Sequence, residues 1–531
     1  MLSRFPMTRR AAALGCLAVA LFAVDPPPAA AQPPAAGEKS SLNLDEFAAG
    51  LHAAHKGKCV GYGFAVYKDG KLVRDGAGGA ARVASDAPAT AFNPGTRVDI
   101  ASCSKLLTAI TVLRELERKN LKVTEPIYKH LPKSWPVHAS IQTITFEQLL
   151  AHKSGLKKEG EASTEAGKAS DFMKVMLKKG VSDPEKKYNY ENANYALCRI
   201  LVPYLRDRAA MEKLEDEPVK FDKTAADCFA DLVRKDVFVP AGLSDDISLY
   251  TWDVTPQKPE TLFYDFADPK NGVKNKDNTL TSGAGGWWMN ARELAAVCSA
   301  LDRFKLLPNH PVLVMRLKEL GMYQVKGKYG TYYTHSGSGA GNVTGKAVFV
   351  MFPDGVQVAV VMNSGNNKLA DGQKDLIVKA YEDARLQADL VVKSFDPGAA
   401  KYDGDFLTVP FKMTVENAGK GDTDATSFAA VRYGDKFVWT GTTPELKAGG
   451  TKDLSGVVKI KDAKRELIGK TIHLVGVADA RIVAADTSVP DYAVVRESNE
   501  KNNESGKEAV KVPGAVPKTP DALAPPKRKN N

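Results

Sequence analysis

The sequence contains, at residues 102–116, the stretch SCSKLLTAITVLREL, in which apolar residues recur three or four positions apart. This spacing predicts a helix with one apolar face, made of Leu106, Ile110, Leu113 and Leu116. Ser102 and Lys105 stand at its start on the same side, so the lysine amine can approach the serine hydroxyl. The positive end of a helix favours an oxyanion, and a partly desolvated lysine can act as a base near neutral pH. The pattern therefore predicts a nucleophilic serine activated by a lysine.

The same Ser-x-x-Lys spacing occurs three times, at Ser102–Lys105, Ser154–Lys157 and Ser498–Lys501. Ser154 lies in a glycine-containing turn and Ser498 in a polar, Asn-rich stretch, so only Ser102 opens a periodic helix. The alternative for Ser102 is an ordinary helix cap beside an exposed lysine. Cys103 is not expected to be the nucleophile, because a helical neighbour projects about 100° away from the face that carries Ser102 and Lys105.

Two further groups of polar residues follow this helix in the chain. Tyr190 supplies a phenol that can relay protons, and Asn192 supplies an amide that can orient a substrate carbonyl. Later, His335 leads to Gly337, where the backbone can approach a substrate, and the N–H of Ser338 can join that of the nucleophile in binding an oxyanion. The alternatives are a helix-entry turn and a loop beside a strand. The order of the three groups favours a single active site.

Strand hairpins stand near both ends of residues 42–390. They pair the following segments: Val60–Tyr67 with Leu72-Val73 across Asp69-Gly70, and Ala347–Phe352 with Val356–Met362 across Pro353-Asp354-Gly355. Helical patterns fill the chain between the hairpins, and further helices are predicted at 44–55 and near 375–388. Strands from both ends with helices between them predict an α+β fold, one antiparallel sheet covered by a helical region.

A second domain is predicted at residues 395–504, where the pattern becomes strand-like throughout. Apolar and polar residues alternate over Leu407–Val415, and turns such as Ala448-Gly449-Gly450 separate further short strands. This spacing favours a β-sandwich. Residues 505–531 are rich in Pro, Lys and Ala without periodicity, which predicts a disordered basic tail.

Residues 1–31 have the pattern of an export signal, in which three arginines precede an apolar run at 11–24 and Ala29-Ala30-Ala31 offers a small-residue cleavage site. The run is shorter than the stretch of about 20 apolar residues that spans a bilayer. We therefore expect an exported protein that is periplasmic, at the cell surface or secreted. The ordinary secretory route and the twin-arginine route both stay open.

The formal net charge of +10 lies largely at the two ends of the chain. Residues 1–31 carry +2 and residues 506–531 carry +4, which leaves +4 for everything between them. No interior basic stripe is interleaved with aromatic residues, so we expect no nucleic-acid partner. The five cysteines beyond Cys16 lack CxxC spacing, which argues against a zinc site or a disulfide framework. One pair can still be oxidised in an exported protein.

Three short motifs in combination resemble the signature elements of one known family: Ser102-Cys103-Ser104-Lys105, Tyr190-Glu191-Asn192 and His335-Ser336-Gly337. Over residues 42–390 the chain is similar to the class C β-lactamase and penicillin-binding-protein superfamily of serine hydrolases. The stretches ITFEQLLAHKSGL at 144–156 and SGAGG at 282–286 agree with this resemblance. It implies that Ser102 is the acylated nucleophile, that Lys105 and Tyr190 transfer protons, and that Asn192 orients the substrate.

His335 stands where this family more usually has a lysine, and with Gly337 and Ser338 it is expected to bind the substrate. A permanent cation helps to hold a substrate carboxylate, so its replacement favours a D-alanyl peptidase or an esterase over a β-lactamase. His152 lies in a turn of the 144–156 stretch and is interpreted as structural. The remaining histidines form no cluster with metal-ligand spacing.

The second domain resembles the bacterial cell-adhesion-related (CARDB) domain, an immunoglobulin-like sandwich, at Val415–Gly419, Leu446–Gly450 and Glu497–Asn503. This resemblance implies a partner in the cell envelope, and the alternative is an accessory domain that only stabilises the enzyme.

The sequence thus predicts a two-step acyl transfer through Ser102 on a small-molecule or peptide substrate with an acyl amide or ester bond, cell-wall peptides included. No metal or organic cofactor is required. The competing hypothesis is a catalytically silent scaffold of the same fold, which presents the adhesion-like domain.

Overall fold

The computed structural model describes residues 42–158, 163–244, 247, 261–274, 277–339, 343–365, 369, 372–423, 426–480, 495 and 501–514. The predicted export signal at 1–31 and the part of the predicted tail beyond residue 514 lie outside these residues. Within them, no helix is long and apolar enough to cross a membrane. All five cysteines in the described part of the chain are free: Cys59, Cys103, Cys198, Cys228 and Cys298.

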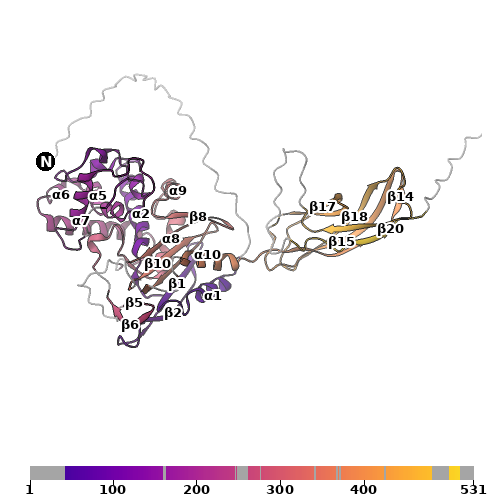
Figure 1. Cartoon of the computed structure of the whole chain (residues 1–531), viewed down its shortest axis with the longest axis horizontal. Helices are drawn as coiled ribbons and strands as arrows, with labels where there is room; N and C mark the ends of the chain where they lie inside the picture. Colours follow the sequence, from indigo (N-terminus) through magenta and orange to yellow (C-terminus); the bar gives the residue numbers. More distant parts are fainter. Residues whose placement is uncertain are drawn as a thin grey trace, which may run out of the picture. The chain divides into compact units, whose positions relative to one another are not determined.

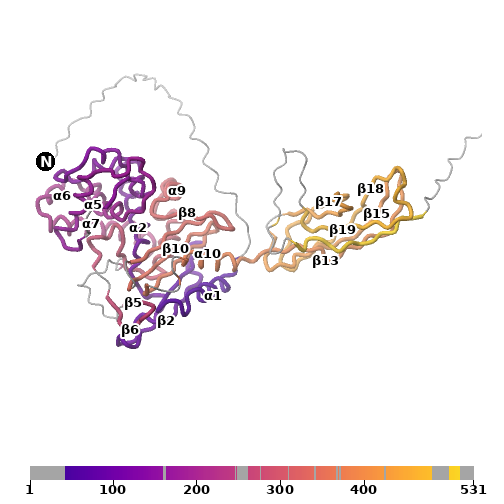
Figure 2. The backbone as a smooth tube through the Cα atoms, viewed as in Figure 1, coloured from indigo at the N-terminus to yellow at the C-terminus, as the bar shows by residue number. Residues whose placement is uncertain are grey.

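Seven antiparallel strands form the central sheet, in the order β3-β2-β1-β11-β10-β9-β8 (Figure 1). They are β1 (Gly61–Lys68), β2 (Lys71–Arg82), β3 (Thr90–Ala91), β8 (Tyr323–Gly327), β9 (Gly330–Ser338), β10 (Lys346–Met351) and β11 (Val356–Met362). Both predicted hairpins are confirmed. In the first, Asp69 and Gly70 have φ angles of 51° and 83°, the positive values that a tight hairpin turn of two residues requires. β1 pairs with β11, so early and late segments of the chain lie side by side (Figure 2).

The central strands are buried on both faces, which explains their nearly unbroken apolar sequences. Successive side chains point to opposite sides of a strand. Ala65 and Ala359 therefore belong to the larger core beneath the helical region, while Phe64 and Val358 belong to a smaller core on the other face. The pairing of Ala65 with Ala359 keeps this division in register across two strands that are distant in the sequence.

Helices cover both faces of the sheet (Figure 1). α1 (Leu44–His55) and α10 (Gln373–Asp383) pack together on one face, and α8 (Ala291–Asp302) packs on the other, against β1 and β11. The remaining helices are α2 (Ser104–Arg118), α3 (Phe146–Leu150), α4 (Asp171–Lys179), α5 (Asn192–Arg206), α6 (Arg208–Glu212), α7 (Pro218–Val233) and α9 (Asn309–Lys318). The predicted α+β fold, an antiparallel sheet with a helical region, is confirmed. The last helix ends earlier than predicted, and Arg385 just beyond it pairs with Asp354 at 3.1 Å.

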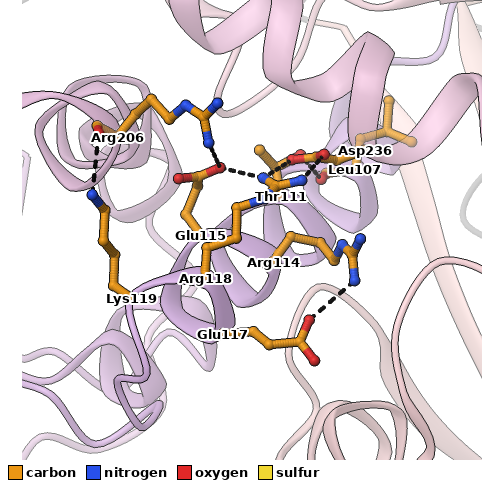
Figure 3. Close-up of polar contacts among 9 residues, drawn as sticks. All are labelled: Leu107, Thr111, Arg114, Glu115, Glu117, Arg118, Lys119, Arg206 and Asp236. Carbon is orange, nitrogen blue, oxygen red and sulfur yellow. Dashed lines mark hydrogen bonds and ion pairs between the residues drawn. The ribbon is translucent and has the colours of Figure 1, made fainter. Parts of the chain in front are cut away.

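A cluster of charges anchors the C-terminal end of α2 (Figure 3). Arg118 donates to both carboxylate oxygens of Asp236, which lies in the π-helical turn η4 (Arg234–Phe238), and to Glu115. The two carboxylates are buried, at 0% and 2% exposure for Glu115 and Asp236, whereas the Arg118 side chain is 32% exposed. Arg118 is therefore the main cation for two buried negative charges, and Arg206 adds a longer contact of 3.9 Å to Glu115.

We expect the substitution Arg118→Met to destabilise the protein by about 3–5 kcal/mol, because it leaves two buried carboxylates without their main cation. The measurement is the shift of the urea unfolding midpoint followed by tryptophan fluorescence. Arg114→Met on the same helix is the matched control, since Arg114 holds a more exposed pair with Glu117 at 3.0 Å. That change should cost less than about 1 kcal/mol. Equal losses of stability in the two variants would show that the buried cluster contributes no more to the free energy of unfolding than an exposed ion pair.

The C-terminal region consists of two four-stranded sheets around one apolar core. One sheet holds β13 (Leu390–Pro397), β14 (Lys401–Asp403), β15 (Phe406–Asn417) and β18 (Thr451–Lys461). The other holds β16 (Ser427–Tyr433), β17 (Lys436–Thr443), β19 (Thr471–Val477) and β20 (Glu508–Lys511). The alternating residues Leu407, Val409 and Phe411 of β15 face this core, as their period of two predicts. The region is consistent with the predicted β-sandwich, and its likeness to the adhesion-related domain stays a prediction.

Two predicted boundaries of this region are wrong. β13 begins at Leu390, so the predicted gap between 390 and 395 falls inside the first strand. β20 lies within the predicted tail 505–531 and pairs with β19, with Val510 opposite Ile472. Both of these side chains are buried, and this burial orders a segment whose composition alone indicated a disordered tail. Glu497–Glu500, part of the adhesion-like resemblance, lie outside the described residues.

Candidate active site

A sharp turn places Ser102 at the entrance to α2. The short strands β4 (Val98–Asp99) and β7 (Trp288–Met289) pair just before it. Ala101 follows with a left-handed φ of 45°, and its N–H donates to Asp99 Oδ1 at 2.7 Å. Ser102 itself lies in the 3-10 turn η1 (Ala101–Cys103), one turn ahead of the α-helix that the sequence predicted to start there. A non-glycine residue in this conformation is held by its surroundings, so the turn fixes where Ser102 points.

Lys105 lies one helical turn further on and is fully buried. Its Nζ donates to three oxygens: Ser102 Oγ at 3.0 Å, Asn192 Oδ1 at 2.7 Å and Ala284 O at 2.8 Å. Burial lowers the pKa of Lys105 to about 7, because the charged amine loses its hydration. Near neutral pH much of the lysine is therefore an uncharged amine, which can take a proton from Ser102.

Tyr190 is the second residue that contacts Ser102 Oγ. Its hydroxyl donates to Ser102 Oγ at 2.8 Å. Burial raises the pKa of Tyr190 to about 12, so the phenol keeps its proton near neutral pH. The two groups beside Ser102 thus differ in kind, since Lys105 is available as a base and Tyr190 keeps a proton that it can donate or relay.

Asn192 is the first residue of α5 and connects the second motif to the first. Its Oδ1 accepts from Lys105, which leaves the amide N–H groups of this exposed side chain as donors toward a substrate. The N-cap of the helix is Glu191, whose carboxylate accepts from the N–H of Ala193 at 3.3 Å. This cap fixes the start of α5 and therefore the position of Asn192.

Strand β9 brings the third motif to Ser102. Gly337 packs so closely against η1 that an added Cβ atom would lie 2.2 Å from the carbonyl oxygen of Ile100 and 2.9 Å from the nitrogen of Ser102. Only glycine allows this approach. The backbone of Ser338, the next residue of β9, consequently lies beside the turn that holds Ser102, where the two N–H groups were predicted to bind an oxyanion.

His335 is buried at the same strand and is uncharged. Its Nδ1 lies 2.7 Å from the carbonyl oxygen of Ser336, which can only accept, so Nδ1 carries the hydrogen. Burial lowers the pKa of His335 to about 3, with the nearby Lys105 as a smaller cause. The ring stacks on Tyr323 with centroids 4.6 Å apart. Its second nitrogen, Nε2, is therefore a hydrogen-bond acceptor, whereas a lysine would offer a cation.

The structure brings all seven predicted site residues to one place: Ser102, Lys105, Tyr190, Asn192, His335, Gly337 and Ser338. Cys103 points away, since its buried thiol donates to the carbonyl of His335 at 3.4 Å. Sequence reasoning missed three contributors. The carbonyl of Ala284 has no side-chain signal, Tyr323 belongs to no motif, and His152, interpreted as structural, lies against Tyr190 with ring centroids 4.4 Å apart. Within the described residues, no group of three or more His, Cys, Asp or Glu could hold a metal ion.

Comparison with known proteins agrees with this arrangement. The family model described as Beta-lactamase matches residues 44–382. The protein flp of Staphylococcus aureus (strain MW2) is 23% identical over 175 residues, which are 32% of this chain and 34% of that protein. PbpX of Bacillus subtilis (strain 168), which is described as a penicillin-binding protein, is 22% identical over 287 residues. These are 52% of this chain and 66% of PbpX. The chain thus spans about a third of the Staphylococcus relatives.

Among solved structures, the D-amino acid amidase of Ochrobactrum anthropi SV3, complexed with L-phenylalanine amide, has a TM-score of 0.50 at 18% identity. The alignment covers 64% of this chain and 99% of the amidase. FmtA of Staphylococcus aureus also has a TM-score of 0.50, at 16% identity over 66% of this chain and 93% of that chain. At such identities the two structures establish a shared fold and leave the substrate open.

Proposed function

The chain belongs to the β-lactamase family, and from this premise we propose that it is a serine hydrolase that cleaves an amide or ester through an acyl-enzyme on Ser102. The observation that carries the proposal is the pair of hydrogen bonds at Ser102 Oγ, from Lys105 Nζ at 3.0 Å and from Tyr190 OH at 2.8 Å. A serine that only capped a helix would not need a buried lysine and a phenol on the same oxygen.

In the first step, Ser102 Oγ attacks the substrate carbonyl carbon while its proton moves to uncharged Lys105 Nζ. The carbonyl oxygen becomes an oxyanion, which the N–H groups of Ser102 and Ser338 bind. The bond to the leaving group then breaks, and the proton reaches that group through Tyr190. Water attacks the resulting ester by the same route in reverse order, which releases the acid and restores Ser102.

The experiment that tests this proposal is capture of the acyl-enzyme. The protein is treated with a nitrophenyl ester or a fluorophosphonate, and the adduct is located by intact mass and peptide mapping. We expect one adduct per chain, on the peptide that contains Ser102. An unmodified protein, inert toward amides, esters and β-lactams alike, would support the silent scaffold instead.

The acceptor nitrogen of His335 favours one class of leaving group. Relatives with a lysine at this position offer a charge that can pair with a carboxylate, but an uncharged acceptor repels one. We therefore propose that the leaving group is uncharged, as in an ester or a simple amide. Of the two activities that the sequence predicted, a D-alanyl peptidase or an esterase, this proposal favours the esterase or amidase: D-alanyl peptides that end in a free carboxylate, and β-lactams, should be poorer substrates.

A matched pair of peptides checks this preference: acetyl-D-Ala-D-Ala and the same dipeptide with a C-terminal carboxamide. We expect kcat/KM to be at least about tenfold higher for the carboxamide, since one charge-sensitive hydrogen bond is worth about 1.5–3 kcal/mol. His335→Lys should shift the ratio toward the carboxylate by a similar factor. His335→Gln is the uncharged control and should leave the ratio near that of the wild type. An equal rate on both peptides in the wild type would contradict the proposal.

The proposal extends to the place of action. The signal-like pattern of residues 1–31 supports export to the periplasm, the cell surface or the medium. The strand-rich domain that starts at Leu390 would then face the cell envelope, where a binding partner is accessible. The size of the mature protein in a cell fraction, compared with that of the full chain, tests the export step.

A further inference from the structure

His152 holds the backbone on both sides of Tyr190. The N–H of Asn189 donates to the carbonyl oxygen of His152 at 2.9 Å, and the N–H of Glu191 donates to its Nδ1 at 3.1 Å. The residues before and after Tyr190 are thus both hydrogen-bonded to His152, Asn189 to its carbonyl oxygen and Glu191 to its ring. Tyr190 needs such a tie, because residues 187–191 belong to no helix or strand.

The ring of His152 also supports the ring of Tyr190. Their two ring centroids lie 4.4 Å apart. The ring of Tyr195, on α5, lies on His152 as well, with 5.1 Å between the ring centroids. One face of Tyr190 therefore packs on a buried residue, while Tyr190 as a whole keeps 38% of its surface exposed. The Tyr190 ring also lies 6.2 Å from the His335 ring between centroids and 5.1 Å from Lys105 Nζ, so the contact with His152 is the closer of its two ring contacts.

His152 adopts a conformation that suits this task and few others. Its φ is 56°, a left-handed value that bulky residues rarely adopt, and its side chain is nearly fully buried. Because Nδ1 accepts a hydrogen bond from a backbone N–H, the ring must carry its hydrogen on Nε2. Burial, with Lys105 as a smaller cause, lowers the pKa of His152 to about 3, so this nitrogen remains an acceptor at neutral pH.

We propose that His152 is a positioning residue for the acyl transfer: it fixes the phenol of Tyr190 at Ser102 Oγ through one ring contact and two backbone hydrogen bonds. The inference rests on the proposed function and adds a residue that makes no contact with the reacting atoms. A displacement of about 1 Å at a catalytic group can lower the rate about 100-fold. Loss of the contacts from His152 is therefore expected to lower the acylation rate measurably.

Two substitutions separate the hydrogen bond from backbone strain. Glycine and asparagine both tolerate the left-handed conformation, but only asparagine offers a side-chain oxygen near the place of Nδ1. We expect His152→Gly to lower the acylation rate by about 100-fold and His152→Asn to recover at least tenfold of that loss. The readout is the burst phase with a nitrophenyl ester. Equal losses in the two variants would overturn the assignment of Nδ1 as the acceptor that matters.

A double-mutant cycle shows whether His152 acts through Tyr190. In a Tyr190→Phe background the phenol is absent, so His152→Gly should lower the acylation rate less than about threefold further. A residue that merely stabilises the fold would cost the same factor in both backgrounds. Additive losses would therefore overturn the proposal.

Hydrogen exchange tests the positioning role of His152 separately from the proposed function, because it requires no catalytic activity. Hydrogen exchange should show lost protection of the Glu191 amide in His152→Gly and retained protection in His152→Asn. The Asn189 amide, which bonds to the main chain of residue 152, serves as the internal control. Should Ser102 prove unreactive in the wild type, the proposed function fails, whereas an unchanged Glu191 amide in His152→Gly would overturn the positioning role itself.

Discussion

Ser102→Ala is expected to reduce turnover of an amide or ester by at least about 10³-fold, because it removes the oxygen on which the proposed acyl-enzyme forms. Ser102 Oγ accepts hydrogen bonds from both Lys105 and Tyr190. Removal of this oxygen also removes the adduct with a fluorophosphonate. The measurement is steady-state hydrolysis of a nitrophenyl ester together with the intact mass after labelling.

The neighbouring residue supplies the control for this experiment. Cys103→Ser preserves a small side chain that can still donate to the carbonyl of His335, as the thiol does at 3.4 Å. Burial raises the pKa of the Cys103 thiol, so the thiolate that would act as a nucleophile is disfavoured. We expect this variant to retain turnover within a small factor. A large loss in Cys103→Ser combined with activity in Ser102→Ala would exchange the two roles.

The second large effect concerns Lys105. Its pKa of about 7 means that the uncharged base becomes more abundant as the pH rises, so acylation should increase through pH 6–8 and level off above. Tyr190, with its pKa raised to about 12, keeps its proton over this range, so its titration should cause no decrease in the acylation rate at the upper end of the pH profile. Lys105→Met should lower the acylation rate by on the order of 10³-fold and abolish the rise.

Pre-steady-state burst rates between pH 5.5 and 9 check this prediction, and Lys105→Met supplies the blank for spontaneous ester hydrolysis. Lys105→Arg tests the alternative that only a positive charge is needed, since an arginine keeps its charge at every pH in this range. A flat profile in the wild type, or full activity in Lys105→Arg, would contradict the role of Lys105 as a base.

The sequence was sufficient for those parts of the fold that depend on local pattern. The period of Leu106, Ile110 and Leu113 predicted α2, and the turn at Asp69-Gly70 predicted the first hairpin. It was not sufficient for β20, because the four residues of this strand are ordered by burial of Val510 against a distant strand. Local composition carries no information about such a partner.

The same distinction holds for the site. Side chains with distinctive chemistry, such as Lys105 and Tyr190, could be predicted from motif order alone. A backbone carbonyl such as that of Ala284, which accepts from Lys105 at 2.8 Å, leaves no mark in the sequence. His152 was visible but misinterpreted in part, since only the folded chain shows that its nitrogen and its carbonyl flank Tyr190.

The pairing of β1 with β11 has a consequence for the protein during its own synthesis. Ser102 and Lys105 are synthesised early. The central sheet can form only later, because β1 (Gly61–Lys68) pairs with β11 (Val356–Met362), which is synthesised near the end of this domain. At about 5–20 residues per second, this delay lasts roughly 15 to 60 seconds. Until then the strand that carries Gly337 lacks the complete sheet that places it beside Ser102, so the predicted oxyanion site cannot form. We therefore expect a chain that is truncated before β11 to lack the proposed hydrolase activity, because the segments of the site come together only when the central sheet is complete.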